Sequence, residues 1–408
     1  METKPSKNDL PATQLKITRP VTIPDQLRLA RYKRAPELGP RILFFSGGTA
    51  LNKLSRILTT FTHNSIHLVT PFDSGGSSAK LRDAFNMLSV GDMRSRLMAL
   101  ADRSVTGHPE IYNLFVYRLP KDQPRTELKD RLKSMVEGGD PLVANVPDPM
   151  RKIIRAHLRF FYNAMPESFD LRGASIGNLI LAGGYLNNNR HIDPVVFMFS
   201  KLVDARGIVR TITGQFLHLV AELENGDTIR GQRNLTGKEV PPINSKVKNV
   251  FLTDDLDGLH SSKTPIRSKI RDLISMAELI CYPVGSFYSS VIANLLPEGV
   301  TNSILDNHCP KIYIPNMGID PEQFGMTVSD CVETLIRYLR HNSVDNVSTE
   351  KLLNFVIVDS KYGDYPGGLD LEQIRRQGVE VIDTPLVTES SRPLIDEERL
   401  IEVVLSLT

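Results

Sequence analysis

One segment, residues 41–70 (RILFFSGGTALNKLSRILTTFTHNSIHLVT), constrains the fold of this chain most. The short apolar runs at its two ends are typical of buried parallel strands, and the leucine and isoleucine spacing between them predicts a helix. A strand, a glycine turn, a helix and a second strand within about 30 residues form a βαβ unit with a right-handed crossover. The segment therefore predicts parallel strand pairing.

The same alternation returns in the second half of the chain. A strand is expected at 248–253, and strands and helices then alternate, with one helix expected at 289–296, up to a final helix. Before this series, the NGD sequence within 217–231 predicts a hairpin turn between two alternating runs. Repeated β-α alternation with apolar strands predicts a doubly wound, mostly parallel, Rossmann-like α/β sheet.

The chain of 408 residues divides into three parts by composition. Residues 1–40 are basic and spaced by prolines, and we expect them to form an extension that packs loosely on the body. Residues 41–408 form the α/β domain, and a charged, proline-containing stretch at about 104–172 predicts a helical insertion. Apolar helices expected between 150 and 200 offer a surface for homo-oligomer formation.

Charge and composition exclude several classes of partner. The net charge is only +2, with acids and bases interspersed, so no nucleic-acid-binding face is expected. No apolar run reaches the length of about 18 residues that a membrane span needs, and the polar N-terminus does not resemble a signal peptide. The three cysteines form no paired motif and are expected to be reduced, which favours a cytoplasmic protein.

Glycine and hydroxyl residues follow several of the expected strands. In a doubly wound sheet, ligands bind beyond the carboxyl ends of the strands, and backbone amides at helix starts suit a diphosphate. The loops in question are Ser46–Thr49, Asp73–Ser78, Pro283–Ser290 and Pro315–Gly318. In the second loop, Gly75, Gly76, Ser77 and Ser78 are the expected phosphate contacts. The sequence SGGTALNK matches neither the dinucleotide nor the P-loop fingerprint.

Two acids, Asp73 and Asp92, allow more than one interpretation. Asp73 ends the second expected strand, where dinucleotide enzymes hold a ribose hydroxyl, but the Gly-Gly-Ser-Ser that follows favours phosphate and metal binding. Asp92 is expected to cap a helix and is spaced to pair with Arg96. The acidic cluster at 254–257 lacks the spacing of a calcium loop and is expected to be a solvated turn.

Several motifs occur in the order and spacing of one superfamily. They are FSGGTALNKLSRIL, LVTPFDSGGSSAKLRDAFNMLSVGDMRSRLMALAD, GASIGNLILAG and PVGSFYSSVIANLLPEGV, and they span roughly residues 41–340. The chain resembles the CofD-like superfamily, which contains 2-phospho-L-lactate transferase and the gluconeogenesis factor, a nucleotide-sugar-binding regulator.

The resemblance implies roles for individual residues. Asp73 and Asp92 would be the catalytic pair that binds Mg²⁺ and positions the substrate. The residues expected near the nucleotide are Gly47, Gly48 and Thr49 at the diphosphate, Asn178 at a helix start, Gly285 and Ser286 in a later loop, and Asn316 near the base or ribose. The ligand would be a nucleotide diphosphate conjugate, GDP- or UDP-linked.

This chain departs from the superfamily pattern in three places. Ala50 replaces a third glycine, Ser74 replaces a second acid, and Pro283-Val284 replaces Gly-Pro before the Gly-Ser pair. The retained acids favour a Mg²⁺-dependent transferase of the 2-phospho-L-lactate transferase type. The lost acid and the Gly-Gly-Ser-Ser loop favour a non-catalytic regulator that binds a nucleotide sugar. The transferase is the function that we expect from the sequence, and the regulator is the alternative.

Overall fold

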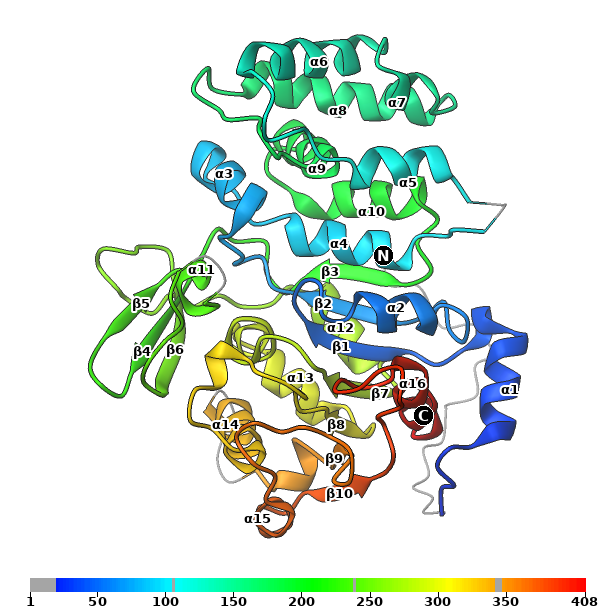
Figure 1. The fold of residues 1–408 in the computed structure, drawn as a ribbon, viewed down its shortest axis with the longest axis vertical. Coiled ribbons are helices and arrows are strands. Elements are labelled where there is room, and N and C mark those ends of the chain that lie inside the picture. Colours follow the sequence, from blue (N-terminus) through cyan, green and yellow to red (C-terminus); the bar gives the residue numbers. More distant parts are fainter. Residues whose placement is uncertain (1–19, 105–106, 238–239, 342–346) are drawn as a thin grey trace, which may run out of the picture.

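A seven-stranded parallel sheet lies at the centre of the protein (Figure 1). The structure is a computed structural model, and it describes residues 20–104, 107–237, 240–341 and 347–408. The strands are β1 (Ile42–Ser46), β2 (Ile66–Val69), β3 (Ile208–Thr211), β7 (Leu279–Tyr282), β8 (Lys311–Tyr313), β9 (Phe355–Val358) and β10 (Glu380–Asp383). The predicted doubly wound, parallel α/β sheet is confirmed.

The strand order, β10-β9-β8-β7-β1-β2-β3, sets the position of a ligand site. From β1 the chain moves outward in one direction to β2 and β3, and it then returns to β7 and moves outward in the other direction. The order therefore reverses between β1 and β7. A crevice forms outside the carboxyl ends of strands at such a switch point.

Apolar residues on both faces of the strands explain why their sequences are continuous apolar runs. In β1, Leu43 and Phe45 pack in one core, while Ile42 and Phe44 pack in another on the opposite face. The helices on the first face are α12 (Ser268–Ser275), α13 (Val300–Asp306) and α14 (Val328–His341), with α15 (Leu371–Arg376) against α14. Those on the second face are α1 (Gln26–Arg34), α2 (Asn52–Leu58) and α16 (Glu397–Ser406).

The described part of the N-terminal extension is docked on the last helix. The backbone N–H of Asp25 donates to Ser406 Oγ at 2.8 Å, and Arg28 Nη1 donates to the Ser406 carbonyl oxygen at 2.8 Å. Leu29 is buried in the core that α16 shares. Loose packing was therefore the wrong expectation for residues 20–40, while residues 1–19 lie outside the described residues.

A layer of helices stands beyond the β3 edge of the sheet (Figure 1). It contains α3 (Gly76–Phe85), α4 (Gly91–Leu100), α5 (Pro109–Val116), α6 (Arg125–Glu137), α7 (Pro141–Ala144), α8 (Met150–Ala164), α9 (Ile176–Asn187) and α10 (Ile192–Leu202). These helices share one hydrophobic core. At Gly183 a β-carbon would lie 2.8 Å from the His157 carbonyl carbon, so glycine is what lets α9 pack so closely on α8.

A small antiparallel sheet projects from the side of the molecule (Figure 1). Its order is β5 (Thr228–Arg230), β4 (His218–Leu223) and β6 (Val247–Thr253), with the short helix α11 (Gln232–Leu235) beside it. The hairpin predicted within 217–231 is confirmed by the β4–β5 pairing. The strand expected at 248–253 forms, but it pairs antiparallel with β4 instead of joining the parallel series.

The segment expected to be a helix at 289–296 has a different form. It consists of one π-helical turn, η2 (Phe287–Val291), followed by a 3₁₀ turn, η3 (Ile292–Asn294). Three N–H groups at the start of η2 donate to the carboxylates of Asp320 and Glu322. These tertiary contacts explain why helical spacing alone was misleading here. Three short 3₁₀ turns, η1 (Pro36–Leu38), η4 (Pro321–Gln323) and η5 (Thr349–Lys351), complete the elements.

Candidate functional site

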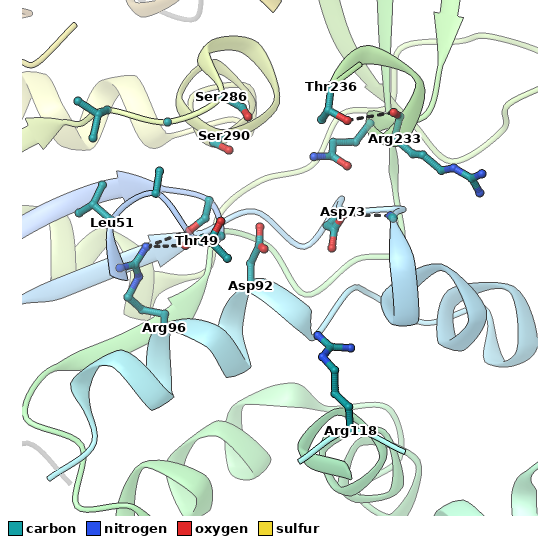
Figure 2. Close-up of a pocket in the computed structure, with 17 residues that line it drawn as sticks. Thr49, Leu51, Asp73, Asp92, Arg96, Arg118, Arg233, Thr236, Ser286 and Ser290 are labelled. Carbon is teal, nitrogen blue, oxygen red and sulfur yellow. Dashed lines mark hydrogen bonds between the residues drawn. The ribbon is translucent and has the colours of Figure 1, made fainter. Parts of the chain in front are cut away.

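A cavity of about 490 Å³ lies at the carboxyl ends of β1 and β7, at the switch point (Figure 2). It is lined by the β1–α2 loop, the loop before α3, the helix α4, Arg118 after α5, the helix α11, and the turn after β7. The lining residues are Gly47, Gly48, Thr49, Ala50, Leu51, Asp73, Gly75, Asp92, Arg96, Arg118, Gln232, Arg233, Thr236, Val284, Gly285, Ser286 and Ser290.

The glycines after β1 are required by close packing. A β-carbon at Gly47 would lie 2.8 Å from Ser290 Cβ and would overlap the Ser290 hydroxyl oxygen. A β-carbon at Gly48 would lie 3.2 Å from Asp92 Cγ and would overlap one carboxylate oxygen. The loop therefore runs between Ser290 on one side and Asp92 on the other, with its bare backbone against both.

Arg96 holds this loop from behind. Its guanidinium is fully buried, and Nη2 donates to the carbonyl oxygens of Gly47 and Gly48 at 3.1 and 3.0 Å, while Nη1 donates to Ser55 Oγ at 2.5 Å. In a trans peptide the C=O and the next N–H point in opposite directions. The N–H groups of Gly48 and Thr49 therefore point away from Arg96. Burial lowers the Arg96 pKa to about 10, which leaves the group charged at neutral pH.

Asp73 shapes the start of α3. Its Oδ1 accepts the Gly75 N–H at 3.0 Å, and Gly75 is the residue that caps the helix. A β-carbon at Gly91 would lie 3.5 Å from Asp73 Oδ2 and would overlap Ser78 Oγ. Since Asp92 is the next residue along the chain, this close approach brings the Asp73 loop against the start of α4.

Asp92 is not the N-cap of α4, so that prediction was wrong. The helix begins at Gly91, the cap is Val90, and Asp92 lies in the first turn. This position directs its side chain toward the β1–α2 loop and the cavity, as Figure 2 shows. The Arg96 guanidinium, expected to pair with Asp92 along the helix, is hydrogen-bonded to Ser55 and the loop carbonyls.

The turn after β7 is fixed by Asn316. The Gly285 N–H donates to Asn316 Oδ1 at 2.9 Å, and Asn316 Nδ2 donates to the Gly285 carbonyl oxygen at 2.8 Å. Gly285 and Ser286 line the cavity, whereas Asn316 is not among its lining residues. Asn316 thus positions a loop, and its amide is engaged with backbone at the place where a base contact was expected.

Four other expected phosphate contacts, Gly76, Ser77, Ser78 and Asn178, are likewise not among the residues that line the cavity. Asn178 is buried and donates to Ser77 Oγ at 3.0 Å. Its Oδ1 accepts from Arg94 Nε at 2.8 Å.

Ser77 Oγ also accepts from Arg118 Nη1 at 3.4 Å, and Arg118 does line the cavity. Burial and the nearby Arg118 charge lower the Arg94 pKa to about 10. This network therefore positions a cation at the cavity from behind, through Asn178 and Ser77.

Sequence reasoning missed the cavity residues that come from the inserted segments. Arg118 follows α5, while Gln232, Arg233 and Thr236 belong to α11 or its end. Gly231, with φ of +84°, turns the chain from β5 into α11. No motif in the sequence links these residues to the glycine loops, because tertiary packing alone brings them together.

Asp73 and Asp92 are the side chains that fit a divalent cation. Within the described ranges, no group of three or more His, Cys, Asp and Glu residues could hold a metal ion. Mg²⁺ is commonly held by one or two carboxylates, with water and phosphate oxygens completing its octahedron. Two carboxylates beside the hydroxyls of Thr49 and Ser290 are such a donor set, so these residues fit Mg²⁺.

The acidic cluster at 254–257 forms an exposed turn, in which Asp255 Oδ1 accepts the Asp257 N–H.

The fold and the site define a doubly wound α/β protein with a glycine-lined, arginine-supported cavity at its switch point. The chain belongs to the CofD family, because the family model described as "2-phospho-L-lactate transferase CofD" matches residues 42–387. The expected CofD-like resemblance is thereby confirmed. Among the helices of the described residues, none is long and apolar enough to cross a membrane.

Several curated relatives are gluconeogenesis factors. The one from Bacillus subtilis is 28% identical over 356 residues, which cover 86% of this chain and 92% of that protein. The one from Halalkalibacterium halodurans is 27% identical over 352 residues, covering 85% of this chain and 90% of that protein. A crystal structure of a UPF0052 family protein from Bacillus halodurans is similar in fold, with a TM-score of 0.66 at 23% identity, covering 90% of this chain and 99% of that one.

Proposed function

We propose that the cavity binds a nucleoside diphosphate conjugate, GDP- or UDP-linked, together with Mg²⁺, and that the protein is a regulator of the gluconeogenesis-factor type. One observation carries this proposal: the glycine loop after β1 and the glycine-serine turn after β7 meet at the switch point beside two carboxylates. Nucleotides bind at this place in doubly wound sheets.

The polar groups of the cavity support a diphosphate. Arg96 turns the Gly48 and Thr49 N–H groups away from itself, and Ser286 and Ser290 add hydroxyl donors. Arg118, which follows α5 and is hydrogen-bonded to Ser77 Oγ, adds a cation at the cavity. Backbone N–H groups in such loops, together with arginine forks, are suited to phosphate oxygens. Asp73 and Asp92 would hold Mg²⁺, which when bound neutralises charge on those oxygens.

Ser74 supports the regulatory role. Its Oγ accepts the Arg233 N–H at 2.9 Å, and its own N–H donates to Gln232 Oε1 at 3.4 Å. The position where the superfamily often has a second acid therefore attaches α11 to the Asp73 loop. The two gluconeogenesis factors named above match this chain over most of their own length, and this also favours regulation.

Group transfer is the second candidate, favoured by the retained Asp73 and Asp92 and by the transferase description of the family model. An acceptor hydroxyl oxygen would form a bond to the distal phosphorus of the diphosphate. The bond from that phosphorus to the bridging oxygen would break, and a nucleoside monophosphate would leave with the electron pair. A cavity carboxylate would take the hydroxyl proton.

Calorimetric titration with UDP, GDP, ADP and their sugar conjugates, with and without Mg²⁺, tests the binding proposal. We expect Mg²⁺-dependent binding of at least one uridine or guanosine ligand, and no binding of any ligand would refute it. Assays for release of nucleoside monophosphate then separate the two roles. Tight binding without release supports regulation, and Mg²⁺-dependent release with a hydroxyl acceptor supports transfer.

A further inference from the structure

Glu322 is a buried carboxyl group that holds one wall of the cavity without lining it. It lies in η4 and is only 1% exposed. Its Oε2 accepts the N–H groups of Tyr288 and Ser289, each at 2.8 Å, and its Oε1 accepts the Ser289 hydroxyl at 2.5 Å. All three donors belong to the π-helical turn η2.

Two serines that line the cavity are positioned by the η2 turn. Ser286 precedes it and Ser290 lies within it, and both line the cavity from the side opposite Asp92 (Figure 2). A π-helical turn leaves the usual helical bonding pattern and is common at functional sites. Here the N–H groups that start the turn are bound by acids, with Asp320 Oδ2 accepting the Phe287 N–H at 2.8 Å. The acids therefore set where Ser286 and Ser290 stand.

The Ser289 side chain also connects the η2 turn to α11, beside the small antiparallel sheet. Gln232 Nε2 donates to Ser289 Oγ at 3.5 Å, and Gln232 Oε1 accepts the Ser74 N–H at 3.4 Å. Glu322, Ser289, Gln232 and Ser74 thus form one hydrogen-bonded series from the η2 turn to the Asp73 loop. Two opposite walls of the cavity are tied together through it.

We propose that Glu322 is a positioning residue for the anionic ligand: it holds the η2 turn so that Ser286 and Ser290 face the ligand, and its proton state sets the affinity. This inference rests on the proposed binding of a diphosphate.

Burial and the neighbouring Asp320 carboxylate raise the Glu322 pKa to about 8. The other titratable groups around this acid pair are Tyr288 in η2, Tyr313 in β8 and Cys331 in α14, and burial raises the pKa of each, so they are neutral near pH 7.

Both proton states of Glu322 hold the turn, but they differ in charge. The protonated acid accepts the two N–H groups through its carbonyl oxygen and donates its O–H to Ser289 Oγ. The ionised acid places a negative charge behind a wall that faces an anion, so an anionic ligand binds more tightly to the protonated form. Affinity should therefore fall as the pH rises through about 8.

Two substitutions separate the geometric role from the charge. Glu322→Leu leaves the Tyr288 and Ser289 N–H groups without their acceptor, and we expect the Kd to rise about tenfold or more. Glu322→Gln imitates the protonated acid, because its Oε1 accepts both N–H groups and its Nε2 donates to Ser289 Oγ. This variant should keep wild-type affinity near pH 7 and lose the decline above about pH 8.

Asp359→Leu is the matched control. Asp359 is also 1% exposed, and its Oδ2 accepts the Leu386 and Val387 N–H groups at 2.8 and 3.0 Å, but it is not among the residues that line the cavity. Its loss should lower stability without changing the Kd. Circular dichroism verifies that each variant is folded before binding is measured.

The test measures the Kd of inorganic pyrophosphate with Mg²⁺, alongside UDP and GDP, from about pH 6.5 to pH 9 in wild type and variants. The ratio of variant to wild-type affinity cancels the titration of the probe itself. Two results support the inference: a loss of affinity in Glu322→Leu, and a ratio of Glu322→Gln to wild-type affinity that is close to one near pH 7 and rises above about pH 8. If Glu322→Leu does not fold, the Glu322→Gln profile decides alone.

Three outcomes would overturn it: a profile of Glu322→Gln identical to wild type, an Asp359→Leu variant that weakens binding equally, or no pyrophosphate binding to the wild-type protein. Binding of pyrophosphate without binding of any nucleotide would instead refute the proposed function and leave this inference standing.

Discussion

The carboxylate of Asp92 lies directly against the backbone of Gly48. A β-carbon at position 48 would be 3.2 Å from Asp92 Cγ and closer still to Oδ1. Gly48 has its carbonyl oxygen bound to Arg96, while Asp92 is in the first turn of the helix that also carries Arg96. The helix α4 therefore places the Asp92 carboxylate and the Arg96 guanidinium against the same glycine loop. This arrangement leads to the first two predictions.

Gly48→Ala should displace the Asp92 carboxylate or the loop. We expect the free energy of unfolding to fall by about 1–3 kcal/mol and the Kd for a nucleoside diphosphate to rise more than about tenfold. Urea unfolding and calorimetry measure the two effects. Gly214→Ala is the control, because the nearest atoms its β-carbon would meet belong to the Arg267 guanidinium, at 3.7 Å or more. Equal effects of both substitutions would contradict the prediction.

Arg96→Lys keeps the charge but removes the guanidinium fork. A lysine cannot bind Ser55 Oγ and both loop carbonyls at once, so carbonyls lose their donors inside the protein. Stability should fall by about 1.5–3 kcal/mol, and nucleotide affinity should fall with it. Arg56→Lys, on an exposed position of α2, should change stability by less than about 0.5 kcal/mol. A wild-type Kd in Arg96→Lys would show that the loop does not depend on the fork.

Asp73→Asn should separate the backbone role of this residue from its charge. The amide oxygen of asparagine can still accept the Gly75 N–H, so α3 should begin as before. The negative charge is lost, and we expect the enhancement of nucleotide affinity by Mg²⁺ to fall about tenfold or more.

Calorimetry with and without Mg²⁺ measures the effect of Asp73→Asn. Asp255→Asn is its control, since Asp255 Oδ1 accepts the Asp257 N–H in a turn that is not part of the cavity lining. Unchanged Mg²⁺ dependence in Asp73→Asn would refute the metal role of this acid.

Asp170 should make the α3 region sensitive to acid. It accepts from Arg172 Nε at 2.9 Å and from Lys80 Nζ at 2.8 Å, and these donors, Arg172 first, lower its pKa well below the ordinary value. The unfolded chain therefore takes up the proton first as the pH falls. The stabilisation is present above about pH 4 and is lost as the pH falls toward the lowered value in the folded state.

The contribution of Asp170 should be below about 1 kcal/mol, because the group is partly exposed and screened by solvent. Asp170→Asn should thus lower the urea midpoint at neutral pH, and this effect should be smaller near pH 3 because part of the stabilisation is already lost there. An equal loss at both pH values would show that the ion pair is not the cause.

Local sequence predicted the strand-forming segments well where burial on both faces leaves a continuous apolar run. Ile42–Ser46 and Ile66–Val69 form as expected and pair parallel. The glycine loop after β1 was also predictable, since strand, turn and helix follow one another within a few residues. For two of the expected segments, contacts with distant residues led to a different structure: 248–253 pairs antiparallel with β4, and the N–H groups of the η2 turn bind the acids at 320 and 322.

The sequence by itself determined the sheet, the glycine loop, and the two acids, because periodicity and turn chemistry are local. Tertiary structure alone decided which residues meet at the cavity. It brought Arg118 and Arg233 to the lining from two insertions and kept Asn178 and Asn316 behind it as supports. The reason is physical: a side chain's role depends on the hydrogen-bonding groups that folding places around it, and those groups here come from segments 31 to 159 residues apart.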